Sequence, residues 1–429
     1  MALQNKLNIF GFNLNLTKNT YNKDYLFQAF ISFNSLLISG INYYFLSKID
    51  FNIIGFFAFQ ETVSTLIIST TGNFFAFSAT RKKNNEKFIA PLIILQIISI
   101  FYIFFISSLA KIALEGNFNI QLTFSLPLIC LIGIRRTFYC LKINTSLGKK
   151  NYILTIINLS ENLVFLILLL ILKFNILNNK IDLINNNLTD ILIIFKAFSN
   201  LIPIILSIYY TFKFLKQIRI SWLFLRAKST LLFFKAIKFV PFKFTRKFIT
   251  YFGILLTSFI DGNLLSLVAI ANKAIYPQIL LDGIIRKSSI NKIRKEIPKG
   301  NKKGKKLFLI STIIGVLSCP LFILIVNNSQ TYNFSEFIIY YLLLSLSISI
   351  RGLSWFSNSI VAKYSVRLGY FASILGLTQP LFLAIFYKLP FNLSILRCLG
   401  ISLVFTSIVI IYYWNIVKRN LIARYNIDN

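Results

Sequence analysis

The Lys and Arg residues of this chain lie in short stretches that alternate with long apolar segments. Of 46 Lys and Arg residues, 38 lie in seven polar stretches and 8 lie elsewhere. The stretches cover residues 6–23, 81–87, 135–150, 213–247, 286–306, 351–367 and 418–424. Neighbouring stretches are far enough apart for two membrane-spanning helices joined by a charge-poor turn. Because short loops rich in Lys and Arg stay on the cytoplasmic side, the pattern predicts an all-α, polytopic membrane protein.

The apolar segments have the length that membrane crossing requires. Hydrophobic residues make up 56% of the chain, and a helix needs about 20 apolar residues to cross roughly 30 Å of hydrocarbon. The predicted spans are 25–46, 52–78, 88–109, 119–139, 151–172, 190–211, 248–266, 268–285, 307–326, 334–352, 367–387 and 392–416. The seventh and eighth spans rest on parity, because an even number of crossings must separate the basic stretches 213–247 and 286–306 if both are cytoplasmic. We therefore expect about 12 transmembrane helices in the cytoplasmic membrane, with both termini cytoplasmic.

The longest cytoplasmic connection divides the chain into two groups of six spans. The predicted units are a cytoplasmic N-terminal segment (1–24), a six-helix bundle (25–211), a basic amphipathic linker (212–247), a second six-helix bundle (248–417) and a cytoplasmic tail (418–429). The linker mixes bases with Phe, Leu and Trp, as does a helix lying on the inner leaflet; a plain linker packed on the bundle ends is the alternative. Two bundles with a central cavity between them are typical of transporters built from repeats.

Several kinds of chemistry are excluded or disfavoured by the composition. The chain has no histidine, so it has no histidine base, metal ligand or proton relay. It has no P-loop pattern, and no loop is long enough for a catalytic domain. We expect no enzymatic activity, no catalytic residues, no cofactor and no metal site. The net charge of +33 lies beside membrane spans, where attraction to anionic membrane lipid accounts for it, so no nucleic acid partner is expected.

Five ionisable residues at membrane depth are candidates for a functional site, because an unpaired charge there is costly. They are the acids Glu61, Glu161 and Asp261 and the bases Lys196 and Arg397. Glu61 and Lys196 lie at similar depths in the first half, and Asp261 and Arg397 lie in the outer part of the second. We expect these residues to line the central cavity, with the two bases binding an anionic head group and the acids close to them.

Each of these residues also has a purely structural interpretation. Lys196 and Arg397 are near enough to the external surface for their long side chains to reach it. Asp261 would lie at the external turn if the seventh span ended early. Glu161 could make a structural hydrogen bond to a neighbouring helix.

Several short motifs occur along the chain. The first is the stretch from Ile49 to Ala58, followed by Gly72 and Arg81. The others are Arg135-Arg136 with Leu147 to Lys150, Ile260-Asp261 with Leu264-Leu265, and Tyr276 with Pro298. These motifs resemble those of polysaccharide and O-antigen flippases of the multidrug/oligosaccharidyl-lipid/polysaccharide exporter superfamily. The first is similar to the second span of that family, with Ile54 in place of its usual Tyr.

The resemblance implies a protein of two helical bundles that works by alternating access. It would move a polyprenyl-pyrophosphate-linked oligosaccharide from the inner to the outer leaflet for polysaccharide or O-antigen biosynthesis. A cationic cavity would hold the pyrophosphate while the lipid tail stays in the membrane. The partners implied are membrane lipid, this lipid-linked oligosaccharide and polysaccharide-assembly proteins; no oligomeric state is implied.

Three other functions stay open at this point. A multidrug or metabolite antiporter of the same architecture would need a cavity dominated by acids, whereas this chain also places bases at membrane depth. A membrane-embedded polysaccharide polymerase or sugar transferase would be expected to carry a long external loop, which this chain lacks. A lipid II flippase of the same superfamily usually has two more spans.

Overall fold

The computed structural model is helical throughout its described part, apart from one short hairpin. It describes residues 6–9, 12–15, 34, 37–69, 100–109, 111, 125–145, 151–177, 188–215, 240–279, 300–326, 334–354, 356–357, 366–388 and 393–425. Each of the twelve predicted spans contains a described helical segment. The hydropathy pattern therefore located the helices, and the predicted all-α membrane architecture is confirmed.

The first half contains four long helices besides helical residues 37–49 and Ile100–Leu109. These four are α2 (Asn52–Ser69), α5 (Leu126–Thr145), α6 (Asn151–Leu177) and α7 (Leu188–Leu215). α5 packs against α2 and α7, and α6 packs against α7. The hairpin precedes this half: β1 (Lys6–Ile9) pairs antiparallel with β2 (Phe12–Asn15), with Lys6 opposite Asn15.

The second half contains seven helices that the structure delimits. They are α9 (Val240–Ser258), α10 (Gly262–Ala274), α13 (Gly300–Val326), α14 (Phe334–Gly352), α16 (Val366–Gly376), α17 (Thr378–Lys388) and α18 (Ile395–Tyr425). α14 packs on α13 and α18, and α18 also packs on α16 and α17. α16 and α17 together occupy the single span predicted at 367–387, with a turn at Leu377 between them.

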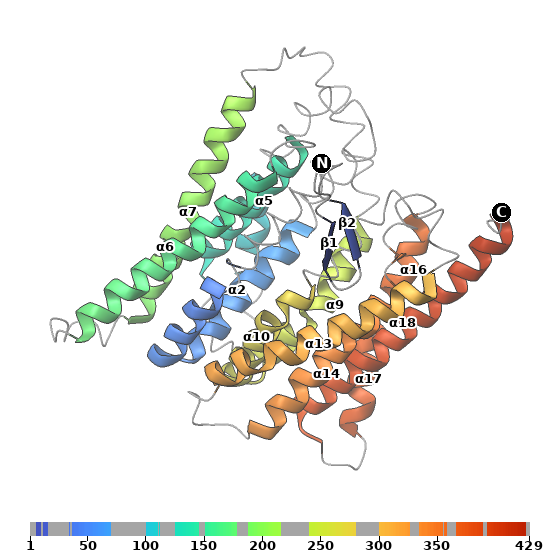
Figure 1. The fold of residues 1–429 in the computed structure, drawn as a ribbon. Helices are drawn as coiled ribbons and strands as arrows, with labels where there is room; N and C mark the ends of the chain where they lie inside the picture. Colours follow the sequence, from blue (N-terminus) through green and yellow to red (C-terminus); the bar gives the residue numbers. More distant parts are fainter. Residues whose placement is uncertain are drawn as a thin grey trace.

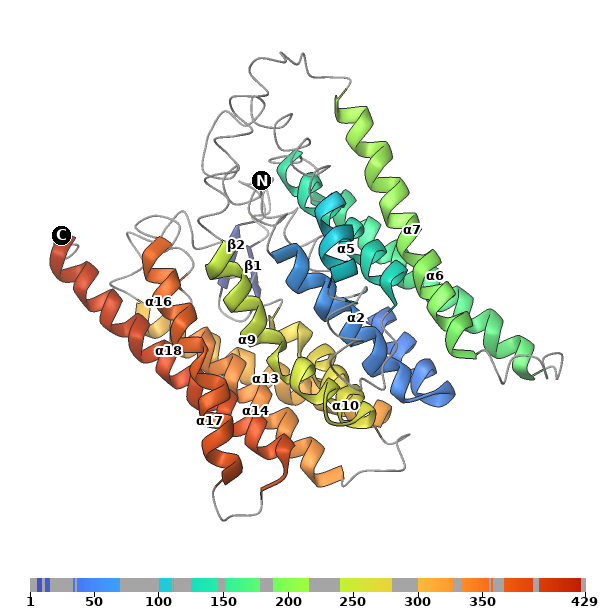
Figure 2. The same cartoon turned by 180° about the vertical axis from the view of Figure 1, so that it is seen from behind.

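The two halves meet through α9 and α10. Figures 1 and 2 show these two helices between α2 on one side and α13 and α14 on the other, and α2 packs against both of them. One buried apolar cluster extends across this boundary, from Phe57 and Phe59 on α2 to Leu265 and Val268 on α10 and Tyr340 on α14. The halves are therefore joined through a shared core.

By length and apolar composition, six of the described helices could cross a membrane, and no membrane is present in the structure. They are Asn52–Ser69, Leu188–Tyr209, Gly304–Val326, Phe334–Gly352, Arg367–Lys388 and Ile395–Leu421. Large apolar side chains on their outer faces are exposed, among them Ile194 on α7 and Leu317 on α13. A lipid-facing surface accounts for this exposure, because lipid tails are as apolar as these side chains.

The second half is closely packed where α13 crosses α14. A Cβ added to Gly315 would collide with Ser345 Oγ and would lie 3.2 Å from Gln278 Oε1. The buried Gln278 amide donates to the Ser345 carbonyl (3.0 Å) and to Ser349 Oγ (2.8 Å). The absence of a side chain on Gly315 thus brings two helices close enough to share a satisfied polar network.

The boundary between the seventh and eighth spans differs from the prediction. The predicted spans were 248–266 and 268–285, whereas α9 ends at Ser258 and α10 begins at Gly262. The intervening Asp261 has extended backbone, and its carboxylate accepts hydrogen bonds from the backbone N–H groups of Asn263 and Leu264. Asp is favoured at this position because it satisfies donors that have no partner within the helix. Its carboxylate thus fixes the start of α10.

α9 also begins earlier than predicted, at Val240, within the stretch assigned to the amphipathic linker. Residues 216–239 of that linker, together with residues 1–5 and 426–429 of the predicted cytoplasmic ends, lie outside the described residues.

Candidate functional site

A buried ion pair joins α6 to α7. Lys196 Nζ lies 2.9 Å from Glu161 Oε1, and the two residues are 7% and 6% exposed. A charge at this depth is stable only with a partner of opposite sign and good hydrogen-bond geometry. The structure therefore brings two of the predicted site residues into direct contact.

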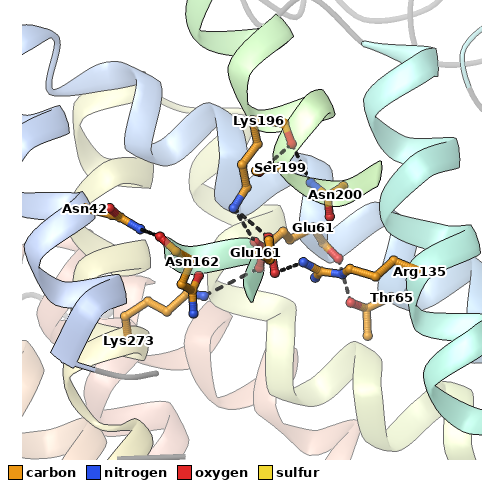
Figure 3. Close-up of polar contacts among 10 residues, drawn as sticks. All are labelled: Asn42, Glu61, Thr65, Arg135, Glu161, Asn162, Lys196, Ser199, Asn200 and Lys273. Atoms are coloured by element: carbon orange, nitrogen blue, oxygen red, sulfur yellow. Dashed lines mark hydrogen bonds and ion pairs between the residues drawn. The ribbon is translucent and has the colours of Figure 1, made fainter. Parts of the chain in front are cut away.

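A second cation and an aromatic ring complete the surroundings of this pair. Arg135 on α5 forms an ion pair with the other carboxylate oxygen of Glu161. Lys196 Nζ also lies 4.9 Å from the centre of the Phe165 ring, within the range of a favourable cation–π contact. Glu161 thus lies between two cations, each from a different helix (Figure 3).

Glu61 on α2 lies between two lysines that come from different halves of the chain. Its Oε1 is 3.8 Å from Lys196 Nζ, and its Oε2 is 3.6 Å from Lys273 Nζ on α10. Both distances exceed the 2.9 Å of the Lys196–Glu161 pair, so these contacts are ionic rather than tight hydrogen bonds. The Lys273 side chain is 37% exposed, and its Nζ lies 5.5 Å from the ring centre of Tyr43.

The helix that carries Lys196 is adapted locally to this position. The side chains of Ser199 and Asn200 donate to the Lys196 carbonyl at 2.8 and 2.7 Å. Pro203 follows within the same helix, and it has no N–H to donate to the Ser199 carbonyl. The Ser199 and Asn200 side chains therefore contact the backbone of α7 at Lys196, one turn before the carbonyl that loses its helical donor.

Glu61 and Arg135 lie near the middle of α2 and α5, whereas Lys273 lies in the last turn of α10. Glu61 is nine residues after the start of α2, and Arg135 is nine residues after the start of α5. At 1.5 Å per residue this is roughly 14 Å, about half the thickness of a hydrocarbon core of roughly 30 Å.

The cluster has a surplus of positive charge. Three cations, Arg135, Lys196 and Lys273, lie within ion-pair distance of two carboxylates, Glu61 and Glu161. Among the described residues of the cluster, the cations therefore outnumber the carboxylates by one. The most exposed of the three cations is Lys273, which lies at the boundary between the halves. This arrangement can receive an anion at little electrostatic cost, whereas a cation would be repelled.

The structure does not bring the remaining two predicted site residues into this cluster. Arg397 on α18 pairs with Glu336 on α14 at 3.7 Å, within the second half. Asp261 is the residue that caps α10. The opposite charges that meet in the second half are therefore Arg397 and Glu336, near the start of their helices, and not the predicted Asp261 and Arg397.

Two members of the cluster were not among the predicted site residues. Arg135 was counted with a cytoplasmic basic stretch, because Arg136 follows it directly. Lys273 lies within the predicted eighth span, 268–285, but was not predicted as a site residue. The sequence did contain a signal for Lys273, because this lysine lies in a segment that parity requires to cross the membrane. An ionisable residue inside a span is a candidate functional residue by default.

Comparison with sequence families and with curated proteins gave no match.

Comparison with solved structures shows a shared fold. A structure described as the lipid II flippase MurJ in an inward closed conformation matches with a TM-score of 0.60 and 13% identity, covering 91% of this chain and 87% of that one. An inward-facing MATE family multidrug resistance transporter of the MOP superfamily matches with a TM-score of 0.54 and 12% identity, covering 92% and 94%. An outward-facing MATE family multidrug resistance transporter of the MOP superfamily matches with a TM-score of 0.54 and 14% identity, covering 95% of this chain and 97% of that one. At these identities the likeness shows that the fold is shared with these three structures.

Proposed function

We propose that the chain is a membrane transporter that moves a lipid-linked oligosaccharide across the cytoplasmic membrane by alternating access. The observation that carries this proposal is the cluster of Arg135, Lys196, Lys273, Glu61 and Glu161 at mid-membrane depth. The fold shared with a flippase and with drug transporters supports a transport role. The surplus of positive charge favours an anionic substrate. A polyprenyl pyrophosphate is such an anion, and its lipid tail keeps it in the membrane.

Lys273 is the residue we assign to first contact with the substrate phosphate. It is held by the longer Glu61 contact and is more than a third exposed, whereas Lys196 is held at 2.9 Å and buried. A phosphate oxygen can therefore replace the Glu61 carboxylate on Lys273 without breaking the buried pair. Glu61 would then interact with Lys196 alone, which keeps its charge compensated.

The test is glycan export in cells that depend on this chain, with Lys273→Ala and Lys196→Ala compared with the parent at equal protein levels. Lys273→Ala should lower export by about ten-fold, equivalent to about 1.4 kcal/mol of lost phosphate binding, and Lys273→Arg should be milder. Lys196→Ala should also lower export, because it removes the partner that Glu61 needs once Lys273 holds the phosphate. Lys173→Ala is the matched control. Lys173 Nζ lies 4.9 Å from the ring centre of Phe45, just as Lys273 Nζ lies 5.5 Å from that of Tyr43, and both rings belong to helical residues 37–49. Normal export in both Ala variants would refute the assignment.

The alternative function is a multidrug or metabolite antiporter of the same architecture, which the shared fold also permits. It would require a cavity attractive to cations. Export of an organic cation that is lost on Glu61→Gln, together with normal glycan export, would support this alternative.

A further inference from the structure

α2 and α10 form a two-layer seam between the halves of the molecule. Both helices begin at the end that the charge pattern assigns to the outside, so they run in the same direction. The first layer is the contact of Gly55 with Ser266 near the start of both helices, and the second is the deeper pair of Glu61 with Lys273. The first layer therefore lies between the charged cluster and the external side.

The first layer is a buried polar contact between the halves. The backbone N–H of Gly55, in the first turn of α2, donates to Ser266 Oγ at 3.0 Å. The Ser266 hydroxyl in turn lies 3.3 Å from the Asn52 carbonyl and 3.0 Å from the Gly262 carbonyl. Ser266 is 0% exposed.

This contact leaves no space for a side chain. A Cβ added to Gly55 would lie 2.7 Å from Ser266 Oγ and 2.9 Å from the Ser266 backbone nitrogen. The backbone atom cannot yield as a flexible side chain could, so any larger residue at position 55 must separate α2 from α10. Water is excluded from the seam at this level for the same reason.

We infer that the Gly55–Ser266 contact is the external gate of the transporter, and that Ser266 sets how often the gate opens. The inference rests on the proposed function, since a gate has meaning only for a chain that moves a substrate. Neutral hydrogen bonds between the halves suit this role, because the net contribution of each is small and water can replace them once the helices separate.

The gate can be measured with a cysteine placed directly beneath it. Ala58 is 5% exposed and lies three residues after Gly55 and three before Glu61, which puts it on the same helix face between the two layers. In a chain whose four cysteines are replaced by Ser, Ala58→Cys is treated with a membrane-impermeant thiol reagent applied to intact cells. The labelling rate reports the fraction of molecules whose gate is open.

Adding Ser266→Ala should raise the labelling rate at least about five-fold, since the Gly55 N–H loses a buried acceptor. Gly55→Ala should raise it further, because the seam cannot close. Ser258→Ala is the matched control. Ser258 is the last residue of α9, at the predicted external end, and its hydroxyl donates to the Leu255 carbonyl of its own helix. Loss of this hydroxyl should leave the labelling rate unchanged. The inference would be overturned if either gate variant, present in the membrane at the parental level, were labelled at a rate within two-fold of the parent's. An equal rise of the labelling rate in the Ser258→Ala control would also overturn it.

A disulfide provides a second test with Gly55 and Ser266 intact. A Cβ added to Gly262 would lie 3.5 Å from Asn52 Oδ1, so Asn52→Cys and Gly262→Cys should form a disulfide on mild oxidation. The bond should stop glycan export, and a reductant should restore it; undiminished export from a fully cross-linked chain would overturn the gate. The labelling test needs no substrate, so failure there removes the gate alone, whereas failure of the Lys196 and Lys273 variants to alter export removes the proposed substrate site alone.

Discussion

At the scale of single residues, Glu161 is the most strongly constrained charge in the described part of the chain. It is 6% exposed and contacts both Lys196 and Arg135. Removing one partner of a buried ion pair typically costs about 3–5 kcal/mol, because the other charge stays buried without compensation. The same pair therefore contributes to the stability of the first half as well as to the charge of the site.

This predicts a strong coupling between Glu161 and Lys196. Glu161→Gln and Lys196→Met should each lower the midpoint of thermal unfolding in detergent. The double variant should lose less than the sum of the two, with a coupling of about 0.5–3 kcal/mol. Strictly additive losses would mean that the two side chains do not interact in the folded protein.

At the scale of helices, the sequence was sufficient to locate the spans but not the contacts between them. Apolar length and charge parity predicted a helical segment in each of the twelve positions where the structure has one. They could not show whether Asp261 continued a span or capped α10, because the carboxylate is compatible with both until the path of the backbone is known. The Glu61–Lys273 pair was beyond prediction, since it joins residues 212 positions apart and depends on how the halves pack.

Helix packing gives a prediction at Gly315. Gly315→Ala should force α13 away from α14 and disturb the Gln278 network, at a cost of about 1–3 kcal/mol for overpacking. Gly40→Ala is the control, because no atom lies within 4 Å of a Cβ added there. The expected result is a lower unfolding midpoint for the first variant only. Equal midpoints for the two variants would show that the close contact between α13 and α14 is not required.

At the scale of the whole molecule, the alternating basic stretches predict which loops lie outside. Lys180 belongs to an external turn and Lys292 to a cytoplasmic loop in the twelve-span arrangement; both lie outside the described residues. Single cysteines at these positions, in a chain without its native cysteines, should differ in labelling by an impermeant thiol reagent on intact cells. Position 180 should react and position 292 should not, and equal labelling would reject this topology.

The cationic cluster is proposed to bind the phosphate of a lipid-linked sugar during transfer. The most direct measurement uses the purified chain in liposomes that contain a fluorescent polyprenyl-pyrophosphate-linked oligosaccharide, with transfer between leaflets followed by a quencher added outside. We predict transfer by the parent chain, a rate about ten-fold lower for Lys273→Ala, equivalent to about 1.4 kcal/mol, and a parental rate for Lys173→Ala. Transfer that is equally fast in all three chains, or no transfer of this lipid together with transport of organic cations, would contradict the account.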